Sequence, residues 1–106
     1  CTLMKKAEEE MQKYLANVVV NKPSIPIISN FVASAQNDPT KIKELLIKQI
    51  CGRVRWRESI LYMNTEGINK IVEIGPSKTL TNMMKRFKLD LKTINIESID
   101  DIKNYD

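Results

Sequence analysis

The sequence contains no histidine among its 106 residues. A serine or cysteine nucleophile that depends on a histidine base cannot be assembled from such a chain alone, and neither can a histidine-containing metal site. The chain also opens on Cys1 rather than on a methionine, and a helical pattern begins almost at once. These features predict a part of a domain, with some of its chemical groups lying elsewhere.

Cysteines and long apolar runs are scarce as well. The two cysteines, Cys1 and Cys51, lack any metal-ligand spacing and allow only one disulfide, which is too few for a secreted disulfide framework. A reducing compartment is expected. No apolar run approaches the roughly 20 residues that cross a bilayer, and no signal pattern opens the chain. The sequence therefore predicts no association with a membrane.

The composition is that of a globular protein, with 42% hydrophobic and 28% charged residues. A chain of this length fits one domain or part of one. Seventeen basic and 13 acidic residues give a formal charge of +4. This charge is compatible with an acidic partner without requiring one.

The hydrophobic pattern predicts helices that alternate with strands. Apolar residues recur at steps of three and four from Thr2 to about Asn17 and indicate an amphipathic helix. Three valines at 18–20 suggest the start of an extended segment. Ser24–Ser29 suggests a buried strand, with Pro26 at an edge or strand-start position. Asp38 followed by Pro39 predicts the start of a helix that ends near Cys51 and Gly52.

The second half continues the alternation. A helix is expected from about Arg55 to Gly67, with Trp56, Ile60 and Met63 inward. A strand at Lys70–Ile74 precedes a helix with Leu80, Met83, Met84 and Phe87 inward; Thr93–Ile96 is a further strand, and Ser98 caps a short last helix. The five methionines are interpreted as core packing. The expected fold class is α/β, with a mainly parallel sheet flanked by helices.

Gln49 is the first candidate site residue. It lies on or beside the predicted apolar face of its helix, formed by Ile42, Leu45, Leu46 and Ile50. In one interpretation its side chain satisfies nearby backbone groups. In the other its main-chain carbonyl, in the last helical turn and without an intrahelical donor, accepts a proton from a histidine ring and holds the correct tautomer. Both interpretations remain open.

Two further segments have a functional and a structural interpretation. The turn from Glu73 to Lys78 leads from a strand into a helix whose free N–H groups suit an anion, although a purely structural turn is favoured. Arg53, Arg55 and Arg57 surround Trp56 and resemble a nucleic-acid surface. Helical geometry instead favours a solvated basic face over a buried tryptophan.

Several stretches of the sequence resemble motifs of the malonyl-CoA:acyl carrier protein transacylases. They occur in the same order as in that family, and the resemblance extends to about Phe87. They are CTLMK at 1–5, IPIISN at 25–30, LIKQI at 46–50, VRW at 54–56 with Glu58 and Ser59, and EIGPSKTL at 73–80. The resemblance implies that residues 1–106 form the C-terminal portion of the large subdomain of an α/β-hydrolase-like acyltransferase. The nucleophile elbow and a small ferredoxin-like subdomain would lie upstream.

The resemblance also implies the chemistry. A serine takes the malonyl group from malonyl-CoA, a histidine acts as its base, and an arginine pairs with the malonyl carboxylate. The acyl group then passes to the phosphopantetheine thiol of the acidic acyl carrier protein. None of these three residues lies in this chain, and the histidine would stand directly before Cys1. What carries over is Gln49, whose main-chain carbonyl would orient that histidine.

The implied partners are malonyl-CoA, acyl carrier protein and the rest of the acyltransferase domain, with no cofactor, no metal and no nucleic acid. The implied location is cytoplasmic, with a plastid or the mitochondrial matrix as the alternative. Two residues depart from the family pattern: Ser77 replaces a second glycine, and Arg53 stands where proline is common. The acyltransferase domain of a polyketide synthase, or a small basic interaction module without catalysis, remains as an alternative.

Overall fold

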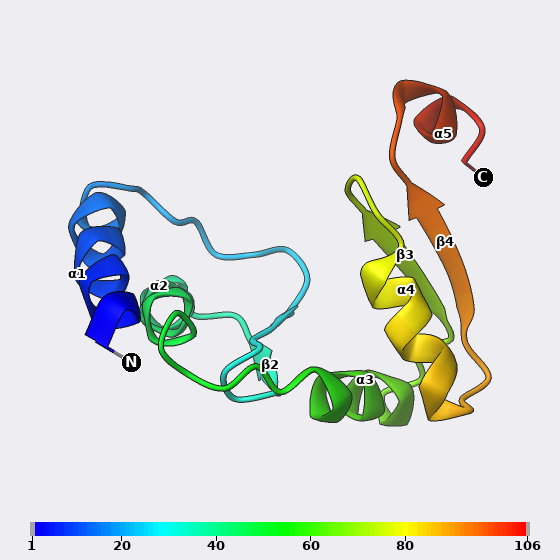
Figure 1. The fold of residues 1–106 in the computed structure, drawn as a ribbon, viewed down its shortest axis with the longest axis horizontal. Helices are drawn as coiled ribbons and strands as arrows, with labels where there is room; N and C mark the ends of the chain where they lie inside the picture. Colours follow the sequence, from blue (N-terminus) through cyan, green and yellow to red (C-terminus); the bar gives the residue numbers. More distant parts are fainter. Residues whose placement is uncertain (1, 106) are drawn as a thin grey trace. The chain divides into compact units, whose positions relative to one another are not determined.

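The computed structural model describes residues 2–105 as helices alternating with short strands, in agreement with the predicted α/β class (Figure 1). The chain divides into two compact units, one ending at Tyr62 and the other beginning at Met63. The elements in chain order are α1 (Thr2–Ala16), β1 (Ile27–Ile28), β2 (Ala35–Gln36), α2 (Pro39–Lys48), α3 (Trp56–Thr65), β3 (Lys70–Ile74), α4 (Thr79–Met84), the 3-10 helix η1 (Lys85–Phe87), β4 (Lys92–Ile96) and α5 (Ile99–Lys103).

Helix α2 packs beside α1 in the first unit (Figure 1). Its start follows the prediction, since an Asp38 carboxylate oxygen accepts a hydrogen bond of 3.0 Å from the Thr40 N–H and Pro39 occupies the first turn. Ile42 and Leu45 are buried, as the expected core face requires. Leu46 was expected beside them but is 41% exposed, although it follows Ile42 by four residues and lies near it on the helix; the segments that pack against α2, not the helix period, decide this difference.

The expected strands before α2 are only partly present. The segment at 18–20 forms no strand, and the Val18 N–H instead bonds to the Leu15 carbonyl at the end of α1. The predicted buried strand at 24–29 reduces to β1, whose Ile27 is 43% exposed. Strand β1 pairs antiparallel with β2, which was not predicted. β-branched residues favour a strand only where a partner strand is available. This explains why no strand forms at 18–20 and why the strand expected at 24–29 is so short.

The second unit is built on the parallel pair β3 and β4, in register from Lys70 opposite Lys92 to Ile74 opposite Ile96. Helix α4 and η1 form the connection and α4 lies over the strands (Figure 1). This strand, helix and strand order confirms the predicted parallel pairing, because parallel strands need such a crossover.

The helices of the second unit follow the prediction in part. The helix expected to reach Phe87 ends at Met84, and the 3-10 helix η1 follows it. Met84 is buried as expected, but Leu80, also expected inward, is 38% exposed. The predicted cap of the last helix is confirmed, because the Ser98 hydroxyl accepts a hydrogen bond of 3.1 Å from the Asp101 N–H.

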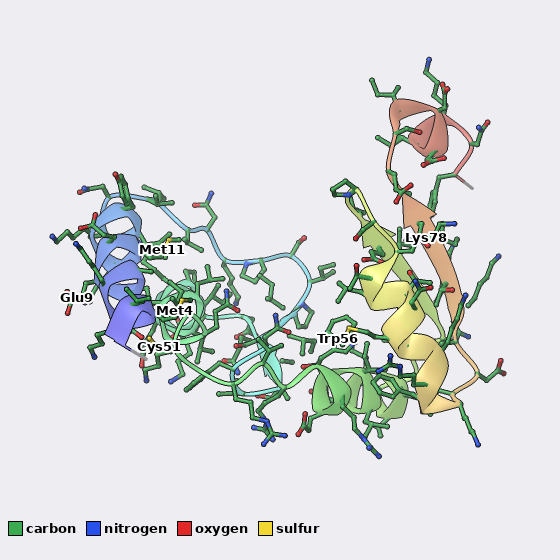
Figure 2. The ribbon with its side chains drawn as sticks, viewed as in Figure 1. Met4, Glu9, Met11, Cys51, Trp56 and Lys78 are labelled. Atoms are coloured by element: carbon green, nitrogen blue, oxygen red, sulfur yellow. The ribbon has the colours of Figure 1, made fainter. Side chains whose placement is uncertain are left out.

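The core is small. Among the described residues only five hydrophobic side chains are buried: Ala33, Ile42, Leu45, Ile60 and Met84. Many large apolar side chains remain exposed, including Met4 and Met11, which extend from α1 in Figure 2 and which were expected to pack in a core. Within residues 2–105, no helix is both long enough and apolar enough to span a bilayer.

Candidate functional site

Gln49 lies directly after the last residue of α2. Its backbone dihedrals are still helical, at φ −65° and ψ −18°, and its N–H donates to the Leu45 carbonyl over 3.0 Å. No donor from residues 2–105 reaches the Gln49 carbonyl oxygen. The structure therefore presents an unused main-chain acceptor at the negative end of a helix, as the sequence predicted.

A recess of about 220 Å³ adjoins this residue. Gln49 lines it together with Ser29 and Asn30, which follow β1, and with Gln36 from β2. Ile28, Ile42, Leu45 and Leu46 supply apolar walls. A carbonyl beside such a partly apolar recess can hold a proton donor such as an imidazole N–H in a fixed direction.

The Gln49 side chain is half-buried and makes no hydrogen bond within residues 2–105. The interpretation in which its amide satisfies neighbouring backbone thus finds no partner in the described chain. Its main-chain role remains a prediction, because the histidine that it would orient is not one of these residues.

The Glu73 turn has a clear structural role. The Glu73 carboxylate accepts hydrogen bonds from the Leu80 N–H at 3.2 Å, the Thr81 N–H at 2.9 Å and the Thr81 hydroxyl at 2.7 Å. The Asn95 amide, in β4, donates to it at 3.1 Å. The free N–H groups that suited an external anion are therefore occupied by the chain's own carboxylate, which supports the structural interpretation.

These bonds change the acidity of Glu73. The hydroxyl of Thr81, followed by the backbone N–H groups of Thr81 and Leu80 and the amide of Asn95, holds the pKa of the carboxyl below its ordinary value, while partial burial opposes this change. The partners Thr81 and Asn95 were missed in the sequence, where only the acidic residue before a Gly-Pro turn gave a signal.

One of the three arginines around Trp56 has a structural role. All three are exposed, but Arg55 contributes to structure: its N–H donates to the Asn30 carbonyl at 2.8 Å and its Nη1 to the Val32 carbonyl at 3.4 Å. Trp56, which was expected to be buried, is half-buried, and its indole Nε1 has no hydrogen-bond partner in the described part of the chain.

Cys51 lies near the start of α1 (Figure 2). Partial burial raises the pKa of its thiol, and the Glu8 carboxylate adds to this effect, so Cys51 is poorly suited to act as a thiolate. Cys1, expected to adjoin the site, lies outside the described residues. Across residues 2–105, no group of three or more His, Cys, Asp and Glu side chains is placed to hold a metal ion.

No family model matches the sequence. Individual curated proteins do match it, and two of them carry the same name. A malonyl CoA-acyl carrier protein transacylase of Bacillus subtilis is 36% identical over 101 residues, which are 95% of this chain and 32% of the relative. The protein of that name from Haemophilus influenzae is 33% identical over 99 residues, 93% of this chain and 32% of the relative.

Solved structures agree with these sequence matches. An acyl carrier protein S-malonyltransferase from Vibrio cholerae superposes with a TM-score of 0.84 at 39% identity, covering 97% of this chain and 34% of that one. A malonyl-CoA:ACP transacylase from Synechocystis gives 0.86 at 32% identity, covering 96% and 35%.

The chain thus spans about a third of the length of the curated relatives that it matches. Over that third, both the sequence and the α/β fold are shared, and Gln49 lies directly after a helix that the sequence motifs had singled out. The chain is homologous to a segment of the malonyl CoA-acyl carrier protein transacylases.

Proposed function

We propose that the intact protein that carries this segment transfers a malonyl group from malonyl-CoA to acyl carrier protein in fatty-acid synthesis. The observation that carries the proposal is the 36% identity to a malonyl CoA-acyl carrier protein transacylase over 95% of the chain. Residues 1–106 would form the C-terminal portion of the large subdomain, and the nucleophile would lie in the remainder of the protein.

The reaction has two half-steps. A serine hydroxyl attacks the malonyl thioester, its proton passes to the histidine base, and the coenzyme A thiol leaves with a proton from that histidine. The phosphopantetheine thiol of the carrier protein then attacks the acyl-serine ester and restores the serine. The proposed reaction needs no metal or prosthetic group of the protein itself.

This chain would contribute the Gln49 carbonyl. A carbonyl that accepts the N–H of one ring nitrogen leaves the other nitrogen free to take the serine proton. It also stabilises the imidazolium that forms after this transfer, because hydrogen bonds to charged groups are stronger than those between neutral groups. Within residues 2–105 no donor reaches this carbonyl, which supports the role.

The test is covalent labelling with radioactive malonyl-CoA. The intact protein is expected to become labelled on a serine and to pass the label to the thiol of acyl carrier protein. The isolated 106-residue chain, which lacks a histidine, is expected to remain unlabelled. Stable labelling of the isolated chain would contradict the proposed location of the nucleophile.

A further inference from the structure

Gly52 and Phe31 are in unusually close contact. A Cβ atom placed on Gly52 would lie 2.5 Å from both Cδ2 and Cε2 of the Phe31 ring and 3.0 Å from the Lys48 carbonyl oxygen. Real Cβ atoms essentially never approach another heavy atom below 3.0 Å. The ring therefore occupies the space that any side chain at position 52 would need.

This contact lies at one end of the turn that contains Gln49. The Gly52 N–H donates to the Lys48 carbonyl over 3.0 Å and so closes a backbone turn around Gln49. The direction of the Gln49 carbonyl depends on the dihedral angles within this turn. Any displacement of Gly52 away from the ring must consequently alter that turn.

The backbone that carries Phe31 is itself anchored. The Asn30 carbonyl, on one side of Phe31, accepts from the Arg55 N–H at 2.8 Å, and the Val32 carbonyl, on the other side, accepts from Arg55 Nη1 at 3.4 Å. Within the same loop, the Phe31 N–H donates to the Ser29 hydroxyl at 3.1 Å. The backbone on both sides of Phe31 is therefore held in place by hydrogen bonds.

We infer that Phe31 and Gly52 are positioning residues for the proposed reaction: the ring, seated against a residue that has no side chain, sets the direction in which the Gln49 carbonyl meets the catalytic histidine. This inference rests on the proposed function. Neither residue touches the reacting atoms, and both act through the turn at 48–52.

The test uses the intact protein and the variant Gly52→Ala. The added methyl group is expected to push the turn from the ring, misdirect the carbonyl and lower kcat by roughly ten- to a hundredfold, as expected for the loss of a hydrogen bond to a charged group. Loss of this acceptor destabilises the imidazolium and lowers the pKa of the histidine. The ascending limb of kcat/KM against pH should therefore move to lower pH.

Two further variants separate positioning from stability. Gly67→Ala is the matched control, because Gly67 has φ +88° and a Cβ there meets nothing within 4 Å. It is expected to lower the melting temperature and leave the pH profile unchanged. Phe31→Ala removes the ring and leaves Gly52 unchanged, so it is expected to lower kcat and to move the pH profile in the same direction as Gly52→Ala.

The outcomes distinguish the two proposals. If the unmodified protein is not malonylated by malonyl-CoA, the proposed function fails. If it is malonylated but Gly52→Ala retains the normal kcat and pH profile, only the positioning role fails. The positioning role would also be overturned if Phe31→Ala left both kcat and the pH profile unchanged.

Discussion

At the scale of single residues, Glu73 shows how one side chain joins separate segments. Its carboxylate, at the end of β3, accepts hydrogen bonds from two residues of α4 and from Asn95 in β4. Helix α4 is only six residues long and receives no side-chain cap from Lys78, which directly precedes it. Glu73 has the role of that cap, because its carboxylate accepts hydrogen bonds from backbone N–H groups in the first turn of α4.

Glu73 should make stability depend on acid pH. Its folded pKa is depressed below the ordinary value of 4.5, so its contribution is complete above that pH and is lost as pH falls through the folded pKa. Glu73→Gln should destabilise the intact protein at neutral pH, and the difference from the unmodified protein should shrink below about pH 4.5. Denaturant unfolding at a series of pH values measures this. A difference that is constant with pH would contradict the role of the charge.

Gln49 permits a direct test of main-chain function. Gln49→Ala should retain much of the activity of the intact protein, because the proposed acceptor is the backbone carbonyl. Gln49→Pro should abolish most of it, since proline removes the N–H that bonds to the Leu45 carbonyl and distorts the helix end. Turnover assays with both variants form the comparison, and near-normal turnover in Gln49→Pro would exclude the role.

At the scale of elements, α2 is the helix that positions the proposed site. Its start depends on the Asp38 cap and Pro39, and its end presents Gln49. The buried face between them consists of Ile42 and Leu45. A shift of this helix would move the Gln49 carbonyl at its end.

Removing the cap should loosen α2. Asp38→Ala loses the acceptor for the Thr40 N–H and should cost about 1 kcal/mol, whereas Asp38→Asn keeps an acceptor and should cost less. Hydrogen exchange of the α2 amides in the intact protein reports this difference locally. Protection in Asp38→Ala equal to that in the unmodified protein would show that the cap contributes nothing.

At the scale of the whole molecule, the imbalance between core and exposed apolar surface is the main feature. Leu3 is 88% exposed, Val19 84% and Ile74 78%, while Ile60 is the only described large side chain that is fully buried. Isolated exposed apolar residues are normal, but so many in a chain of this size indicate surface that another part covers. We propose that the remainder of the intact protein covers it.

A dye that binds apolar surface tests this proposal. The isolated 106-residue chain is expected to bind anilinonaphthalene sulfonate strongly and the intact protein only weakly, because the surface around Leu3, Val19 and Ile74 would be covered in the latter. Fluorescence titration at equal molar concentration provides the measurement. Equal binding by both proteins would refute the covering role of the remainder.

The amino-acid sequence by itself determined the elements whose signals are local. The Asp38 and Pro39 start of α2, the Ser98 cap and the strand at 70–74 depend on neighbouring residues, and all three are confirmed. The position of Gln49 at a helix end is equally local. Only the tertiary structure decided the antiparallel pairing of β1, the exposure of Leu46 and Leu80, and the contact of Phe31 with Gly52. These features depend on segments distant in sequence, and side-chain periodicity carries no information about which distant segment will be the neighbour.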